Sequence, residues 1–309
     1  MTGAVPLVCG DVPLVSVVVM SFNRPQALER CLASLAAQTL AKQKFEVVLV
    51  DVSNPPNHPQ VARYGERLTL RHRIETNRGV AGNRNLGAAA ATAPLLAFLD
   101  DDCVAHPEWL ATLLAAAARH PGALIGGGVT NLLPGNPVAS AGQLIQEAVD
   151  RHFNADPTDA HFVAGLNFAV PTERFRQMGG NDEGYGRRAA EDREFCSRWR
   201  AEGGRIVKAE AALVAHEHRA DLPGFLRQYF NYGRGAWIYH RTKPALSASG
   251  EPTVGSHLGL LKQLGRELTA SPRQQRPLLA LLLLGWEAAN LAGFVREALG
   301  GSQRLGNGR

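Results

Sequence analysis

The stretch LVSVVVMSFNRP (residues 14–25) decides the fold of this chain of 309 residues. Residues 14–20 form a continuous apolar and largely β-branched run, which is typical of a strand covered on both faces. A polar turn follows at residues 21–24, and Pro25 suits the first position of a helix, which the apolar spacing predicts over residues 26–38. The sequence thus begins its ordered part with a buried strand, a polar turn and a helix.

This order of elements repeats further along the chain. Apolar runs predict buried strands over 45–50 and 95–99, with a poorer strand at 68–74 and an Ala-rich helix at 83–92. The alternation of strands and helices indicates an α/β sandwich with a mostly parallel central sheet. Ligands of such sheets bind at the carboxyl ends of the strands. The turn Ser21–Arg24, Asp51 and the triplet Asp100–Asp102 all follow strand ends, so we expect a ligand site at one rim of the sheet.

The pattern becomes looser after residue 106. It still predicts extended segments at 165–170 and 206–214, and helices at 109–119 and 191–202. A triple glycine within residues 123–129 permits close approach of a neighbouring backbone. No internal repeat of solenoid period is present in the sequence.

Three adjacent carboxylates, Asp100, Asp101 and Asp102, are the sharpest chemical feature. They repel one another unless water or a cation neutralises them, and an apolar strand directly before them restricts solvation. Carboxylate oxygens are hard ligands that suit Mg²⁺ or Mn²⁺, and such an ion would hold a diphosphate. A solvated acidic loop is the alternative. We interpret the triplet as a metal site.

Three further motifs are less specific. Glu191 and Asp192 begin a helix, where acids complement the helix dipole, or where one of them serves as a general base. His216 and His218 follow an extended run, so both imidazoles can point to one face and contribute to a metal site, or they are a surface pair. Arg84 lies where a helix begins. The segment around it either caps this helix in the ordinary way or binds a diphosphate.

Composition excludes disorder and fibrous structure, because 45% of the residues are hydrophobic. The net charge of +5 is unevenly placed: residues 1–218 carry 21 Lys and Arg against 23 Asp and Glu, whereas residues 219–309 carry 12 against 5. Four scattered cysteines form no zinc-like or disulfide pattern. The first residues lack the basic region of a signal peptide, so we expect a cytoplasmic protein with reduced thiols.

The last ninety or so residues differ from the rest. Residues 222–241 interleave arginines with aromatic side chains, 243–256 read as a linker, and 278–295 are apolar except for Glu287 and Asn290. The apolar segment is a packing helix, an interfacial helix or a membrane span, and its basic flanks favour a helix on the membrane surface. The arginine-aromatic stretch could bind nucleic acid, but we expect it to be acceptor-side structure instead.

Together these motifs resemble the family 2 glycosyltransferases, which have the GT-A fold. The resemblance rests on four ordered stretches: PLVSVVVMSFNRPQALERCLASL (13–35), FEVVLVDVSN (45–54), NRGVAGNRNLGAAAATAPLLAFLDDDCVAHPEWL (77–110) and GLNFAVPTERFRQMGGNDEGYGRRAAEDREFCSRWRAEGGRIV (165–207). It implies a GT-A catalytic domain over 13–218, with a nucleotide-sugar half at 13–105 and an acceptor half at 106–218. A basic helical extension follows at 219–309, and its composition leads us to expect membrane association.

The resemblance also implies a role for each motif. Asp192 would be the catalytic base with Glu191 beside it, and Asp102 the main metal ligand, with Asp100 as the other acid of the DxD motif and His216 or His218 as a late metal or phosphate contact. The donor nucleotide would lie along Ser21, Asn23, Arg24, Asp51, Arg84, Asp100 and Asp101. The acceptor would lie near Asn181, Asp182 and Glu183, where Asn181 replaces the usual Phe.

The implied activity is transfer of a sugar from a nucleoside-diphosphate sugar to an acceptor hydroxyl with inversion, aided by Mn²⁺ or Mg²⁺. The acceptor would be a glycan, a lipid-linked sugar or a small molecule, as in glycan, glycolipid or cell-envelope biosynthesis. We expect an anionic membrane surface as a further partner, on the inner face of the cell membrane, and no nucleic acid. A non-catalytic nucleotide-sugar-binding or membrane adaptor protein of the same fold, and a nucleotidyltransferase, are the alternatives.

Overall fold

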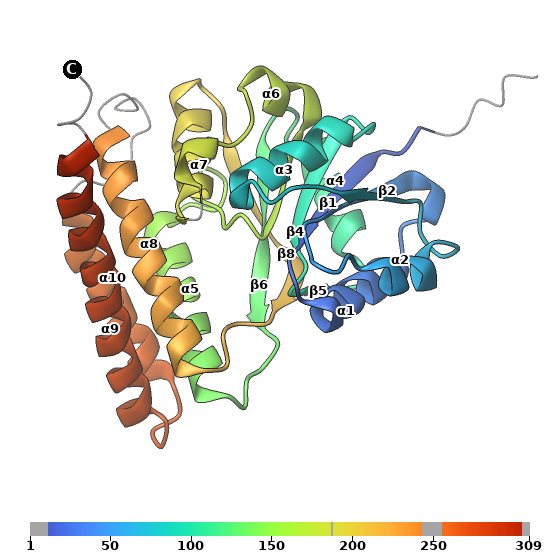
Figure 1. Cartoon of the computed structure of the whole chain (residues 1–309). Helices are drawn as coiled ribbons and strands as arrows, with labels where there is room; N and C mark the ends of the chain where they lie inside the picture. Colours follow the sequence, from blue (N-terminus) through green and yellow to red (C-terminus); the bar gives the residue numbers. More distant parts are fainter. Residues whose placement is uncertain (1–11, 187, 243–254, 305–309) are drawn as a thin grey trace, which may run out of the picture.

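A computed structural model describes residues 12–186, 188–242 and 255–304 (Figure 1). Eight strands form one sheet in the order β3-β2-β1-β4-β7-β6-β8-β5. The strands are β1 (Val15–Ser21), β2 (Phe45–Asp51), β3 (Leu70–Ile74), β4 (Leu95–Asp100), β5 (Cys103–Ala105), β6 (Leu124–Asn131), β7 (Asn167–Pro171) and β8 (Ile206–His216).

Ten α-helices are described, together with two short 3₁₀ turns at Lys42–Lys44 and Glu183–Tyr185. The α-helices are α1 (Pro25–Ala36), α2 (His58–Tyr64), α3 (Gly79–Ala90), α4 (Trp109–Arg119), α5 (Pro137–Phe153), α6 (Thr172–Gln177), α7 (Glu191–Ala201), α8 (Leu222–Thr242), α9 (Gly255–Ala270) and α10 (Arg276–Arg304). The linker predicted at 243–256 lies outside the described residues except for its last two positions, which begin α9.

The sheet is mixed, although its first half is parallel as predicted. Strands β3, β2, β1 and β4 run parallel to one another, and β6 runs parallel to β8. Strand β7 is antiparallel to both β4 and β6, and β5 is antiparallel to β8. The antiparallel strand β7 therefore joins two parallel parts of one sheet.

Both faces of the central strands are buried, which explains their continuous apolar runs. Along β4, Leu95, Ala97 and Leu99 pack into one core with α1 and α4, whereas Leu96 and Phe98 point into a second core. That second core is built from α3, α6 and α7 and is rich in aromatic rings that contact one another. Helices on both faces fix the sheet, so its rim is free to carry polar side chains.

The C-terminal helices form a third core with α5 (Figure 1). Leu144 of α5, Phe225 and Tyr229 of α8, and Leu279 and Trp286 of α10 are all buried in it. The sequence did not predict α5, and its apolar face is covered by residues far along the chain. Helices α8, α9 and α10 are thus packed onto α5 through a shared core.

Candidate functional site

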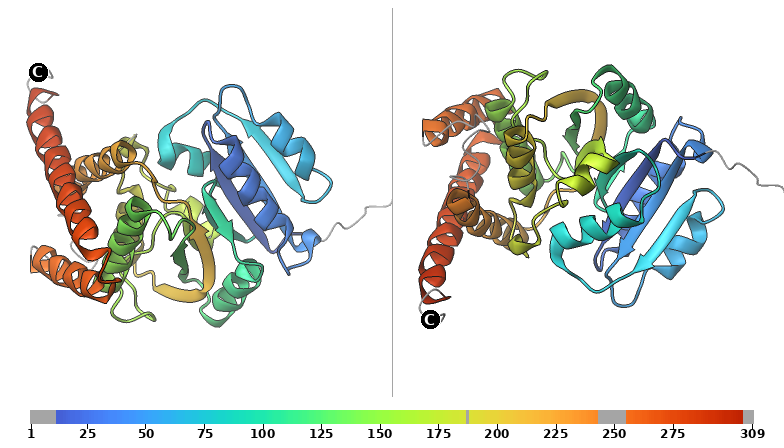
Figure 2. Two further views of the ribbon diagram at one scale, coloured as in Figure 1. Left: turned by 90° about the horizontal axis from the view of Figure 1, so that it is seen from below. Right: turned by 90° about the horizontal axis from the view of Figure 1, so that it is seen from above.

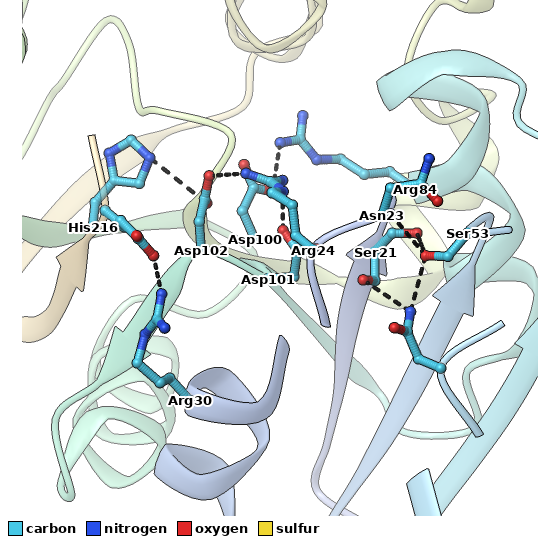
Figure 3. A network of polar contacts seen from close by, with 12 residues as sticks. Ser21, Asn23, Arg24, Arg30, Ser53, Arg84, Asp100, Asp101, Asp102 and His216 are labelled. Carbon is cyan, nitrogen blue, oxygen red and sulfur yellow. Dashed lines mark hydrogen bonds and ion pairs between the residues drawn. The ribbon is translucent and has the colours of Figure 1, made fainter. Parts of the chain in front are cut away.

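The rim of the sheet gathers the predicted site residues because the parallel strands end in register. Ser21 pairs with Asp51, and Met20 pairs with Asp100, so the ends of β1, β2 and β4 are adjacent. The polar side chains that follow these strands lie along one edge (Figure 3). The prediction of a polar site at the carboxyl ends of the strands agrees with this arrangement.

Arg24 binds two of the three carboxylates of the triplet. Its Nη2 lies 2.5 Å from Asp101 Oδ1, and its Nη1 donates to Asp102 Oδ2. Asp101 is fully buried, and this burial, opposed by Arg24, raises the pKa of Asp101 to about 7. Burial disfavours the charge of Asp102 as well, but His216 and Arg24 hold the pKa of Asp102 well below its ordinary value. The pKa values of the adjacent Asp101 and Asp102 are thus shifted in opposite directions.

The two histidines lie in different surroundings, although their rings contact each other with centroids 4.3 Å apart. His216 ends β8 and points its Nε2 toward Asp102 Oδ1, at 3.6 Å. His218 lies beyond the strand, is buried, and pairs its Nε2 with Gln143 Oε1 at 2.9 Å. Burial, and then the neighbouring His216, lower the pKa of His218 to about 3. Only His216 therefore faces the acidic triplet.

The fit of the rim to a divalent metal ion rests on Asp102. Its Oδ1 is buried without a hydrogen-bond partner among the described residues, as is Nδ1 of His216. No group of three or more His, Cys, Asp or Glu side chains in the described part of the chain is arranged to hold a metal by itself. The residues present therefore fit an ion that takes few protein ligands and completes its shell with water or phosphate oxygens, as Mg²⁺ commonly does.

Arg84 joins the acidic triplet to the acids of α7. Only 3% of Arg84 is exposed, and its Nη1 and Nη2 lie 2.9 Å from Glu191 Oε1 and 3.3 Å from Asp100 Oδ1. Burial, and then the charge of Asp192, raise the pKa of Glu191 to about 7, although Arg84 opposes the shift. Our expectation that Arg84 approaches a diphosphate has no direct support here, because its guanidinium lies beneath the rim and holds Glu191 and Asp100.

Asp192 is held by backbone amides at the start of α7. Its Oδ2 accepts from the Gly165 amide at 3.0 Å, and its Oδ1 accepts from the Arg193 amide at 2.8 Å. Tyr232 of α8 lies near Asp192 and Glu191. Burial raises the pKa of Tyr232, and the negative charges of these two acids raise it further. Tyr232 is 44% exposed, so part of its ring is open to solvent. Sequence reasoning placed this stretch on the acceptor side but did not single out Tyr232.

Asp51 organises the loop after β2. The carboxylate is fully buried and accepts from the amides of Ser53 (3.0 Å) and Asn57 (2.6 Å), while its Oδ2 lies 2.9 Å from His72 Nε2. These hydrogen bonds overcome the effect of burial and lower the pKa of Asp51. We expected Asp51 to contact the base or ribose, but its oxygens bind Ser53 and Asn57 of the loop and His72 of β3. Ser53, Asn57 and His72 were missed, since only the folded chain brings them together.

Ser21 and Asn23 differ in exposure. Ser21 is buried and its Oγ accepts from Asn57 Nδ2 at 3.3 Å. Asn23 is exposed and has a φ of 55°, a left-handed conformation that asparagine tolerates. Its amide donates to Ser53 Oγ and its Oδ1 accepts from the Asn54 amide, both at 2.9 Å. Ser21 therefore supports the loop from below, whereas Asn23 borders its outer surface (Figure 3).

The predicted acceptor segment is tied to α3 by Asn85. Asn85 Oδ1 accepts from the Asn181 amide at 2.9 Å, and its Nδ2 donates to Asn181 O at 2.9 Å and to Glu183 Oε1 at 3.1 Å. Asp182 caps the following turn by accepting from the Gly184 amide at 2.8 Å. Asn181 is 3% exposed, whereas Asp182 and Glu183 are exposed. Only these two acids of the segment thus reach solvent.

Comparisons with known proteins identify the family and the fold that this chain resembles. The family model for glycosyl transferase family 2 matches residues 16–165. A validoxylamine A glucosyltransferase of Streptomyces hygroscopicus subsp. limoneus is 34% identical over 227 residues, covering 64% of this chain and 50% of the relative. A pre-mycofactocin glycosyltransferase of Mycobacterium tuberculosis is 29% identical over 204 residues, covering 61% of this chain and 43% of the relative. The chain thus spans about half the length of the curated relatives it matches.

A solved structure supports the fold over nearly the whole chain. The mannosyltransferase PcManGT from Pyrobaculum calidifontis, in complex with GDP-Man and Mn²⁺, superposes with a TM-score of 0.63 at 19% identity. The match covers 93% of this chain and 87% of that one. Staphylococcus aureus TarS 1–349 superposes with a TM-score of 0.53 at 18% identity, covering 95% and 92%. Residues 16–165 thus match glycosyl transferase family 2, and the chain around them has the GT-A fold of these glycosyltransferases.

Proposed function

We propose that the chain transfers a sugar from a nucleoside-diphosphate sugar to an acceptor hydroxyl with inversion of configuration. The observation that carries the proposal is the buried Arg84, which binds Asp100 of the donor-side triplet and Glu191 of the acid pair on α7. A donor at the triplet would therefore lie beside Asp192. The names of the curated relatives, both glycosyltransferases, favour the same reaction.

The acidic triplet would receive the diphosphate part of the donor. Asp102, with Asp100 and His216 beside it, would hold Mn²⁺ or Mg²⁺, which neutralises charge on the leaving diphosphate when bound. PcManGT has Mn²⁺ and GDP-Man in its structure, which supports a divalent ion in this proposal. Arg24 already brings positive charge to the triplet, and its guanidinium can also pair with a phosphate oxygen. Asn23 and the loop held by Asp51 would border the nucleoside.

The acid pair would serve the acceptor. Asp192 would take the proton of the acceptor hydroxyl as its oxygen attacks the anomeric carbon from the face opposite the diphosphate. A single displacement of this kind inverts the configuration. The two backbone amides that bind Asp192 orient its carboxylate. Binding both substrates side by side would remove much of the entropic barrier.

The acceptor would enter between the segment 181–183 and α8. Asp182 and Glu183 offer carboxylates for sugar hydroxyls, and the exposed ring of Tyr232 offers an apolar face. A glycan, a lipid-linked sugar and a small molecule each fit such a surface. We also propose a cytoplasmic location at the inner face of the membrane, because α10 has an exposed apolar face.

The proposal is tested by supplying the full chain with nucleoside-diphosphate sugars and Mn²⁺ and measuring the nucleotide product. Release of a nucleoside diphosphate with a glycosylated acceptor is expected. Asp192→Asn should lower the turnover number by roughly 10²-fold or more while the donor still binds, because the general base is lost. Asp156→Asn, which changes an exposed aspartate outside the site, should leave turnover unchanged.

The metal part of the proposal has its own measurement. Asp102→Ala should weaken nucleotide binding when Mn²⁺ is present but change it little without the ion, and calorimetry under both conditions reports the difference. Full turnover by Asp192→Asn would contradict the catalytic assignment. Release of pyrophosphate from a nucleoside triphosphate and a sugar phosphate, supplied in a parallel assay, would instead identify a nucleotidyltransferase. Donor binding without any product would identify a non-catalytic binding protein.

A further inference from the structure

The outward face of α10 is apolar along most of its length. Its six most exposed large side chains are 44–70% exposed: Leu278, Leu281, Leu284, Leu291, Val295 and Leu299. Their spacing of three, four and seven residues places them in one stripe of the helix. The other exposed positions up to residue 300 are a proline, two alanines and a single charged residue, Arg296. We call this surface the outer stripe.

The opposite face of α10 is fixed to the protein. Leu279, Leu282 and Trp286 are buried in the core shared with α5 and α8. The backbones of α8 and α10 touch at two glycines, since a Cβ on Gly233 or Gly293 would collide with a carbonyl of the facing helix. Helix α10 is the one helix among the described residues long and apolar enough to cross a membrane. A crossing would require this face to leave its core, so a bilayer is expected to meet only the outer stripe.

The charges beside the outer stripe are positive. Lys262, Arg266 and Arg273 are exposed before its start, and Arg296 lies near its end. None of the three acids of the same two helices is fully exposed: Glu267 is 7% exposed and pairs with Arg151, Glu297 pairs with Arg188 and Arg234, and Glu287 is half-buried. An apolar stripe with basic side chains at its borders is the pattern of a helix that lies in an anionic membrane interface.

We propose that the outer stripe of α10 docks on an anionic lipid surface, with the helix lying along the membrane and its leucines inserted among the acyl chains. This inference refines the membrane location proposed above but does not depend on the transfer reaction. A second copy of the chain is a poorer occupant. Any pairing of two stripes would bring Arg273 or Arg296 of one copy near an arginine of the other, with no exposed acid on 258–300 to pair with either.

The test is flotation of the full chain with vesicles of phosphatidylcholine alone or of phosphatidylcholine with phosphatidylglycerol. The chain should bind the anionic vesicles, and less so at high salt. Leu281→Gln combined with Leu284→Gln and Leu291→Gln should weaken binding by at least about tenfold, because each leucine loses its burial in lipid. The matched control, Val12→Gln with Leu213→Gln, changes exposed apolar side chains elsewhere and should bind like the wild type.

Two further measurements keep the proposal open to refutation. Arg273→Glu with Arg296→Glu changes only exposed charges and should also reduce binding to anionic vesicles, even if the glutamine variant folds poorly. Light scattering without lipid should report a species that the leucine substitutions do not change. Four outcomes would each overturn the proposal. The first is that the folded wild-type chain does not float, and the second is that all variants bind equally. The third is retention of the chain after an alkaline carbonate wash, and the fourth is loss of a dimer in the leucine variant. Transfer assays on the same samples would test the proposed reaction independently of membrane binding.

Discussion

Two arginines bind the carboxylates at the rim of the sheet, and they differ in how deeply they are buried. Arg24 is partly exposed and pairs with Asp101 and Asp102, so it can exchange partners when a phosphate arrives. Arg84 is buried and pairs with Asp100 and Glu191, so it is bound to the protein on both sides. The first therefore suits substrate binding, and the second suits positioning.

Replacing the buried arginine tests this division. Arg84→Lys keeps one positive charge but loses the fork that reaches two carboxylates at once. We expect the free energy of unfolding to fall by about 3 kcal/mol, as for other broken buried pairs, and the turnover number to fall more than the donor affinity. Chemical denaturation and steady-state kinetics measure both. Arg119→Lys on the exposed end of α4 is the control, and equal kinetics of the two variants would contradict a positioning role.

The titration of Glu191 predicts a pH effect on stability. Its pKa rises from the ordinary 4.5 to about 7 on folding, so the folded chain binds more protons than the unfolded chain between these values. Stability should therefore fall as pH rises through this window, by about 3 kcal/mol from this group. Glu191→Gln lacks the titrating group. Denaturation of both proteins across the window should show the variant gaining relative stability with pH, and a constant difference would refute the shift.

Sequence reasoning located the acids at the site but not their internal partners. Asp100–Asp102 and Asp51 were predicted at the rim because strand ends and polar residues are visible in sequence. The carboxylate of Asp51 binds Ser53, Asn57 and His72 because a loop closes against a neighbouring strand, and this closure is not visible in the sequence. The choice of His216 over His218 as the group facing Asp102 likewise depends on where β8 ends, which periodicity does not fix.

At the scale of elements, strands were easier to predict than the later helices. Strands β1, β2 and β4 are buried on both faces, so their apolar runs are unmistakable. Helix α5 was missed although Asn136 caps it and Pro137 begins it, because its apolar side chains are interspersed with polar and small ones. Its partner surface comes from α8, α9 and α10, more than 70 residues later, and that pairing is not a local signal.

One such long-range contact adjoins the acid pair. Glu297 of α10 lies 2.6 Å from Arg188 Nη1 and 2.8 Å from Arg234 Nε, and Arg188 is three residues before Glu191. Glu297→Gln should loosen the start of α7, so we expect the turnover number to fall severalfold while donor affinity stays constant, with a loss of about 1 kcal/mol in stability. Kinetics and calorimetry report these. Glu66→Gln, an exposed substitution, is the control, and an equal loss of donor binding would contradict this reasoning.

For the whole molecule, the boundary predicted at residue 218 separates segments that share a core. The charge asymmetry in the sequence is real, but it is spread over α8, α9 and α10, which all share this core, so it does not mark a gap in packing. Figure 2 shows α10 at the edge of the molecule away from α1 and α2, with α8 and α5 between it and the sheet. We therefore infer that the C-terminal helices unfold together with the part that carries the site.

Two neighbouring leucines test that inference. Leu282 is 7% exposed within the shared core, whereas Leu281 is 66% exposed on the outer stripe. Leu282→Ala should lower the free energy of unfolding of the whole chain by about 3 kcal/mol, and Leu281→Ala should change it by less than about 0.5 kcal/mol. Denaturation followed by tryptophan fluorescence and by circular dichroism should give coincident transitions. A separate early transition in Leu282→Ala would show that the two parts unfold independently.

The glycine contacts between α8 and α10 affect how far the site can lie from a membrane bound to α10. Because Gly233 and Gly293 let the two backbones touch, no side chain lies between the helices at these points that could adjust their spacing. Helix α8 is in turn packed against the residues just before the acid pair, where Gly235 abuts Ala189. A lipid surface beneath α10 would then hold Asp192 at a constant height above it. The enzyme would act as a molecular ruler, glycosylating those acceptors whose hydroxyl stands at that height.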